Sequence, residues 1–134
     1  MSYTVTVHMV GPNAPLTNGG NSLAGHMWYT TSDGNHSHSW GFDSESKGRV
    51  TREDDDLYKS VTHSKTIEIT KEQYDRLIDF STNPPSYGFD LGYNVAGNNC
   101  VDFTWAALDT IGMGKDDFNF SPSQQYNLLD NPIS

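Results

Sequence analysis

The chain has 134 residues, a formal net charge of −9 and one cysteine, Cys100. This length suits a single domain that spans residues 1–134, and an acidic chain lacks the basic surface that nucleic acid or anionic membranes attract. One cysteine excludes an internal disulfide framework, and no apolar run is long enough to span a membrane. The first residues lack the basic start and apolar core of a secretory signal. We therefore expect synthesis in the cytoplasm, with no nucleic acid or membrane as partner.

The first half of the chain predicts strands. Residues 3–10 alternate apolar and polar side chains and are rich in β-branched residues, which is typical of a half-buried strand. Residues 26–31 and 36–42 form a strand and its return strand, joined by a hairpin turn at Asp33-Gly34. Residues 64–69 alternate in the same way and predict a further strand.

Two segments between these strands predict connections. Residues 11–25 are rich in Gly, Pro, Asn and Ser, which favours a long loop. Residues 43–61 hold mixed charge and the acidic run Glu53-Asp54-Asp55-Asp56. A solvated connection is the better interpretation of this run, because it lacks the glycine spacing of a calcium-binding loop.

Helices follow the strands. Thr70 with Gln73 three residues later forms a capping box, and the helix it begins should end at Asn83-Pro84-Pro85. A short last helix is expected from Ser121 through Leu128 and Leu129. Because strands come first and helices after them, the fold class is α+β, with an antiparallel sheet and the helices packed on one side.

The clearest helix begins at the cysteine. Apolar and small residues recur at helical spacing along one face, and Gly112 follows where a helix usually stops: Cys100, Phe103, Thr104, Ala107, Leu108 and Ile111. Cys100 thus lies in the first turn, where unpaired N–H groups and the helix dipole favour a thiolate and could bind an oxyanion. Asn99 is expected to be the N-cap, with donation to the oxyanion as its alternative role. A buried structural cysteine is the competing interpretation of Cys100.

A nucleophilic thiol needs a base, and histidine suits that role near neutral pH. His26 is the best placed of five histidines, because it opens a strand directly after the loop of residues 19–25. The strand should hold the ring rigidly, and the loop should leave one side open to substrate. Taken alone, a strand-edge histidine facing water is the simpler interpretation.

The partner that orients His26 should come from the return strand, and the turn decides which residue it is. A two-residue turn at Asp33-Gly34 places Ser39, Gly41 and Asp43 on the face of His26. A turn with a glycine bulge shifts the register by one and places His38, Trp40 and Phe42 there instead. We choose His38 as the third residue, with Ser39 and Asp43 as alternatives.

Three short motifs resemble a known superfamily. Gly25-His26-Met27-Trp28-Tyr29, Ser39-Trp40-Gly41-Phe42 and Asn99-Cys100-Val101-Asp102-Phe103 resemble the circularly permuted papain-like (NlpC-like) cysteine hydrolases. The strand–helix stretch of residues 67–74 and Ser121-Pro122-Ser123 fit the same order. The likeness is greatest to small bacterial amidase effectors delivered by type VI secretion, and it spans roughly residues 24–130 as scattered motifs.

The resemblance implies a permuted papain-like fold in which the histidine strand precedes the cysteine helix. It implies that Cys100 is the nucleophile and His26 the base, with a polar third residue from the following strand. The implied function is an antibacterial toxin, a cysteine amidase that hydrolyses peptidoglycan amide bonds in the periplasm of a target cell. It further implies export without a signal peptide and a cognate immunity protein as partner.

The sequence is also compatible with other functions. The same fold could serve a thiol protease or an acyltransferase. A metal site made by His26, His36 and His38 is a weaker alternative, and no metal or cofactor is expected. A non-catalytic module could instead bind glycans through an aromatic face of the hairpin, made by Trp28, Tyr29 and Trp40.

Overall fold

The structure is a computed structural model, and it describes residues 2–11, 14–22, 25–43, 48–58, 61, 63–94 and 98–118. Its strands are β1 (Tyr3–Val10), β2 (Ala14–Pro15), β3 (Asn21–Ser22), β4 (His26–Ser32), β5 (Ser37–Trp40) and β6 (His63–Ile69). Its helices are α1 (Asp54–Leu57), α2 (Lys71–Thr82), the 3-10 helix η1 (Pro84–Tyr87), α3 (Cys100–Asp109) and α4 (Lys115–Phe118).

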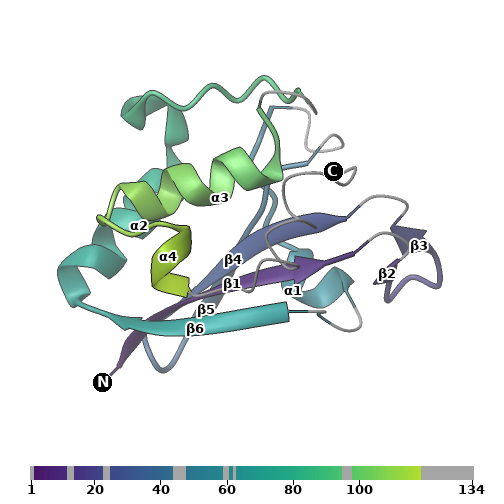
Figure 1. The fold of residues 1–134 in the computed structure, drawn as a ribbon, viewed down its shortest axis with the longest axis horizontal. Coiled ribbons are helices and arrows are strands. Elements are labelled where there is room, and N and C mark those ends of the chain that lie inside the picture. The colour runs from purple at the N-terminus through teal and green to yellow at the C-terminus, as the bar shows by residue number, and fades with distance from the viewer. Residues whose placement is uncertain are drawn as a thin grey trace.

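Four strands form one antiparallel sheet in the order β5-β4-β1-β6, and β2 pairs with β3 in a small separate ribbon (Figure 1). The long pairing of β1 with β4 matches Val10 with His26 at one end and Thr4 with Ser32 at the other. The α+β class and the antiparallel sheet are thus confirmed. Strands β1, β4 and β6 agree with the predicted ranges to within a residue.

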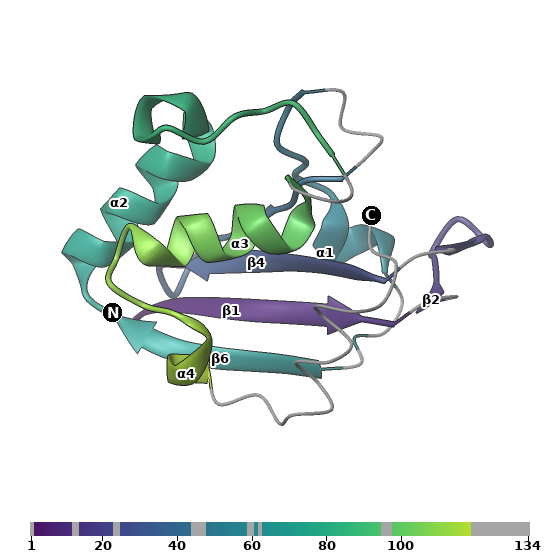
Figure 2. The same ribbon diagram turned by 45° about the horizontal axis from the view of Figure 1, so that its top comes forward.

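The two faces of the sheet differ in chemistry. Val5, Val7 and Tyr29 point to the face covered by α2 and α3, where they join the main core. Figure 2 shows α3 running along β4 on that face. The opposite face is mostly polar, because alternate residues of a strand point to opposite sides. It carries Thr6 and Thr30 beside the buried ring of Trp28.

Both long helices begin at the predicted caps. In α2 the Thr70 hydroxyl accepts from the Gln73 backbone N–H at 3.1 Å, and the Gln73 side chain accepts from the Thr70 N–H at 2.9 Å. The helix ends at Thr82, before the two prolines that cannot continue it. After α3, Gly112 adopts a φ of 76°, a left-handed conformation that favours glycine.

The expected placement of all helices on one side is corrected by α1. This one-turn helix lies against the polar face of the sheet, where the Asp55 side chain reaches β4. Neither α1 nor α4 was expected from the sequence, and the helix predicted from Ser121 lies outside the described residues. Within the described part of the chain, no helix has the length and apolar character needed to cross a membrane.

Candidate active site

Cys100 is the first residue of α3, and Asn99 caps the helix. The Asn99 Oδ1 accepts from the N–H groups of Val101 at 3.0 Å and Asp102 at 3.1 Å, and Asp102 accepts from the Asn99 N–H at 3.0 Å. Asn99 therefore takes the role of N-cap. Two of the first N–H groups of the helix are thereby occupied, so they are not the free oxyanion donors that the helix start suggested.

His26 lies at the start of β4, and the structure brings its ring to Cys100. The Cys100 side chain and the His26 ring share a hydrogen bond. The other side of the imidazole meets a carboxylate, with 3.0 Å between His26 Nε2 and Asp54 Oδ2. A carboxylate only accepts, so the His26 Nε2–H donates to Asp54. Cys100, His26 and Asp54 thus form a hydrogen-bonded thiol–imidazole–carboxylate series.

The charge state of His26 follows from these neighbours. Burial alone would lower its pKa, but the hydrogen bonds to Asp54 and Cys100 outweigh burial and raise the pKa well above 6.5. The ring also packs against two aromatic rings, with centroids at 5.5 Å to Trp28 and 5.6 Å to Tyr58, and those two rings pack on each other at 4.8 Å. The arrangement favours an imidazolium that is fixed in orientation and paired on both sides.

Asp54 is 2% exposed, so its carboxylate depends on protein partners. Its Oδ2 accepts from the Thr51 hydroxyl at 3.1 Å in addition to His26. Thr51 is fixed by two backbone hydrogen bonds with Gly41, of 3.0 and 2.8 Å. A Cβ atom on Gly41 would overlap the Asp54 carboxylate. The glycine therefore provides the space in which the carboxylate meets His26.

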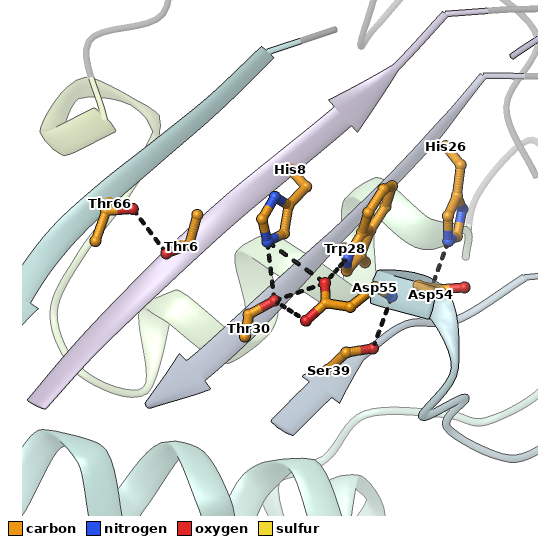
Figure 3. A network of polar contacts seen from close by, with 9 residues as sticks. All are labelled: Thr6, His8, His26, Trp28, Thr30, Ser39, Asp54, Asp55 and Thr66. Atoms are coloured by element: carbon orange, nitrogen blue, oxygen red, sulfur yellow. Dashed lines mark hydrogen bonds and ion pairs between the residues drawn. The ribbon is translucent and has the colours of Figure 1, made fainter. Parts of the chain in front are cut away.

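The next residue, Asp55, attaches α1 to the sheet (Figure 3). Its carboxylate accepts from the Trp28 indole N–H at 2.8 Å and from the Thr30 hydroxyl at 2.9 Å. Its backbone N–H donates to the Ser39 hydroxyl at 3.4 Å. Thr30 gives its one proton to Asp55, so it accepts at 2.8 Å from His8 Nε2. This network holds the short helix in the position from which Asp54 reaches His26.

The choice of His38 as third residue is corrected by the strand register. Ser32 pairs with Ser37 across a four-residue loop, so His38 pairs with Thr31 and lies on the sheet face opposite to His26. His38 Nδ1 instead accepts from the Arg52 guanidinium at 3.1 Å. Asp54, not His38, is the hydrogen-bond partner of His26.

The two alternatives to His38 do lie on the His26 side. The loop is longer than the two-residue turn considered, but the register has the same parity, so Ser39 and Asp43 share that face. An Asp43 carboxylate oxygen lies within 4.8 Å of ligand-type atoms of both His26 and Asp54. Two carboxylates and an imidazole could also hold a divalent cation. The predicted set with His36 is not assembled, because His36 is exposed at the hairpin tip.

The solvated interpretation of the acidic run holds for Asp55 and Asp56, which are exposed, and fails for Asp54. One signal for this was present in the sequence. Asp54 and Tyr58 are four residues apart, the spacing of one helix face, and both are buried. An aspartate on the apolar side of a helical turn needs a partner, and a buried histidine provides one.

The aromatic face expected for glycan binding does not exist as a surface. Trp28 and Tyr29 are fully buried and lie on opposite faces of the sheet, while Trp40 is 2% exposed and donates to Thr31 at 3.0 Å. These side chains stabilise the core, and they leave the hairpin without a flat aromatic platform.

The expected open side of His26 is also corrected. His26 is 2% exposed and Cys100 is fully buried, so the imidazole and the sulfur are enclosed. Tyr93 lies close to them: burial raises its pKa to about 12, with the charges of Cys100 and Asp43 adding to the effect. Its ring packs 5.5 Å from that of Phe42. Substrate access to the sulfur therefore requires a local displacement of the packing around it.

Comparison with protein-family models, with curated protein sequences and with solved structures gives no match for this chain.

Proposed function

We propose that this protein is a cysteine amidase, which hydrolyses an amide bond through an acyl-enzyme. The observation that supports this most is the hydrogen-bonded series Cys100, His26 and Asp54, drawn from a helix start, a strand start and a one-turn helix. Nucleophile, base and orienting carboxylate within hydrogen-bond reach are the parts that such catalysis needs. A buried aspartate beside a histidine that also contacts a cysteine is the kind of charge-coupled cluster in which functional groups are found.

The residues account for each proton in the reaction. His26 Nδ1 takes the proton of the Cys100 thiol, and the sulfur attacks the amide carbonyl carbon to form a tetrahedral intermediate. When the C–N bond breaks, the imidazolium protonates the departing amine and a thioester remains on Cys100. His26 then takes a proton from water, and the hydroxide attacks the thioester. When the C–S bond breaks, the imidazolium returns that proton to the sulfur, so that the carboxylic acid leaves and the thiol is restored. Asp54 stabilises the imidazolium in both halves of the cycle.

The substrate part of the proposal relies on the motif resemblance. The Gly-His strand and the Asn-Cys helix start resemble permuted papain-like amidase effectors, so we assign the scissile bond to a peptidoglycan peptide or cross-link. Action as an antibacterial toxin then follows, with export to the periplasm of a target cell. A producing cell would require an immunity protein that blocks access to Cys100. With the same residues, a protease would form its acyl-enzyme from a protein substrate, and an acyltransferase would pass the acyl group to an acceptor other than water.

The test uses periplasmic expression of the chain and two variants. Wild type should lyse the cells, Cys100→Ala should be harmless, and His36→Gln, which changes an exposed side chain at the hairpin tip, should remain as toxic as wild type. Mass spectrometry of the cell wall should show the cleaved amide only with wild type and His36→Gln. Equal harmlessness of wild type and Cys100→Ala at matched protein levels contradicts the cell-wall proposal.

The cluster of His26, Asp43 and Asp54 supports a second candidate, a metal-dependent hydrolase. The two candidate enzymes differ in which treatment abolishes their activity. A metal enzyme keeps activity in Cys100→Ala and loses it to a chelator. A cysteine amidase loses activity in Cys100→Ala, keeps it in chelator, and is inhibited by added Zn²⁺ that binds the thiolate.

A further inference from the structure

Two adjoining hollows lie beside the edge strand β5, and neither is lined by Cys100 or His26. They have volumes of about 300 and 310 Å³ and share Trp40, Arg52 and Thr82. Because the shared residues connect them, we treat the two hollows as one groove, called the Arg52 groove below. The proposed reaction uses none of its residues.

Arg52 is held in the groove without being neutralised. Its guanidinium lies 4.0 Å from the centroid of the Trp40 ring, and one of its NH₂ groups donates to His38 Nδ1 at 3.1 Å. Stacking and a neutral acceptor both fix the plane of the guanidinium and leave its charge in place. No carboxylate lies within 4.0 Å of it among the described residues. An arginine fixed in this way retains further N–H donors for an anion.

The groove is unusual for this chain because of its charge. The whole sequence has 8 Lys and Arg against 17 Asp and Glu, yet Arg49 and Arg52 both line this groove. Asp75 also lines it, but Lys71 already pairs with that carboxylate at 2.7 Å. An acidic protein that presents two arginines in one hollow offers a local site for a negatively charged ligand.

The remaining walls fit a peptide better than a bare ion. Ile78 and Trp40 line one hollow and Val50 and Leu91 the other, so the cationic centre is flanked by apolar side chains. Planar guanidinium groups bind carboxylates through two parallel hydrogen bonds. We propose that the Arg52 groove binds a short peptide through a free carboxylate on that peptide.

This inference rests on the proposed function for its link to catalysis. Trp40 pairs with Tyr29, three residues along β4 from His26, which is about 10 Å at strand spacing. Arg52 also lies between Thr51 and Asp54 in the chain, next to the residues that orient His26. The preferred substrate is therefore an amide whose peptide also has a free carboxylate.

Binding can be tested without catalysis, using full-length Cys100→Ala protein. The probes are acetyl-trialanine as the free acid, the same peptide as its C-terminal amide, acetate and inorganic phosphate, each titrated while the Trp40 indole and Arg52 Nε–H resonances are followed. The free acid should bind at least about tenfold more tightly than the amide, as a charged hydrogen bond provides. It should also bind more tightly than acetate or phosphate.

Two arginine variants complete the test. Arg52→Gln should abolish the preference for the free acid, whereas Arg76→Gln, which removes an exposed guanidinium that contacts only the Thr110 carbonyl at 3.4 Å in the described residues, should leave it unchanged. Equal binding of acid and amide, or an unchanged preference in folded Arg52→Gln, overturns the proposal that the Arg52 groove binds a carboxylate. Equal binding of acetate or phosphate and peptide overturns peptide recognition. Carboxylate binding without any Cys100-dependent hydrolysis contradicts the proposed function but supports carboxylate binding by the Arg52 groove.

Discussion

The substitution Gly41→Ala tests the geometry of the His26–Asp54 pair with one added methyl group. The new Cβ would overlap the Asp54 Oδ2 and lie 2.7 Å from the Thr51 hydroxyl and 3.0 Å from the Asp54 Cγ. Backbone hydrogen bonds between Gly41 and Thr51 hold both segments, so the carboxylate is the group that moves. Its 3.0 Å hydrogen bond to His26 is then lost.

The size of the effect follows from the kind of bond. A hydrogen bond to a charged group contributes about 1.5–3 kcal/mol, which corresponds to about 10- to 150-fold in an equilibrium. Without Asp54 the imidazolium is less stable, so the thiolate–imidazolium pair shifts towards thiol and neutral imidazole. Only the thiolate reacts with alkylating reagents. Alkylation of Cys100 should therefore slow by about the same factor.

The assay follows iodoacetamide alkylation by mass spectrometry between pH 5 and 9, and it reports one site because the chain has one cysteine. Gly114→Ala is the matched control, since a Cβ there meets no atom within 4 Å. Thr51→Val removes one 3.1 Å bond to Asp54 without adding bulk and should slow alkylation by a smaller factor. Alkylation of folded Gly41→Ala at the wild-type rate would refute the role of Asp54.

Three further predictions concern other residues around the site. His38→Gln should change Cys100 alkylation by less than about twofold, while Asp54→Asn slows it by at least about tenfold; equal effects of the two would restore His38 as the orienting residue. Asp55→Asn should slow alkylation and loosen α1, detected as faster amide exchange at Tyr58, whereas unchanged exchange would show that the helix does not depend on Asp55. Burial lowers the pKa of His8 below 6.5 despite the raising effect of Asp55 and Asp54, so the unfolded chain binds a proton more readily and stability is lost as pH falls below about 6.5. In urea unfolding, His8→Gln should weaken that loss, and an identical pH dependence would contradict it.

Much of the fold could be predicted from local sequence patterns. The alternation in residues 3–10 and the capping box at Thr70 depend on neighbours in sequence, so both could be predicted. The start of α3 at Cys100 was predicted for the same reason. The hairpin register could not be predicted in this way. The four-residue loop is closed by the Asp33 carboxylate, which accepts from the N–H groups of Asn35 and His36. That side-chain closure sets the loop length, and the loop length sets the face of every following residue.

The candidate site also contains residues that could be predicted from local sequence and one that could not. Cys100 and His26 could be named because a helix start and a strand start are local features with known chemistry. Asp54 could not be named, because its burial depends on the contact of α1 with β4 and on the space left by Gly41. Both are tertiary features that involve residues distant from Asp54 in the sequence. A run of acidic residues is solvated in most proteins, and the four-residue spacing of Asp54 and Tyr58 does not single out Asp54 until the tertiary contact is known.

The most direct test of the account is the titration of the His26 ring by NMR in wild type, Cys100→Ala and Asp54→Asn. Because both neighbours raise its pKa, wild-type His26 should titrate well above 6.5, and each variant should titrate lower than wild type. The stability that this protonation contributes should be present below pH 6.5 and be lost as the pH rises through the wild-type value. A His26 that titrates at the same pH in all three proteins would contradict the nucleophile–base–carboxylate series.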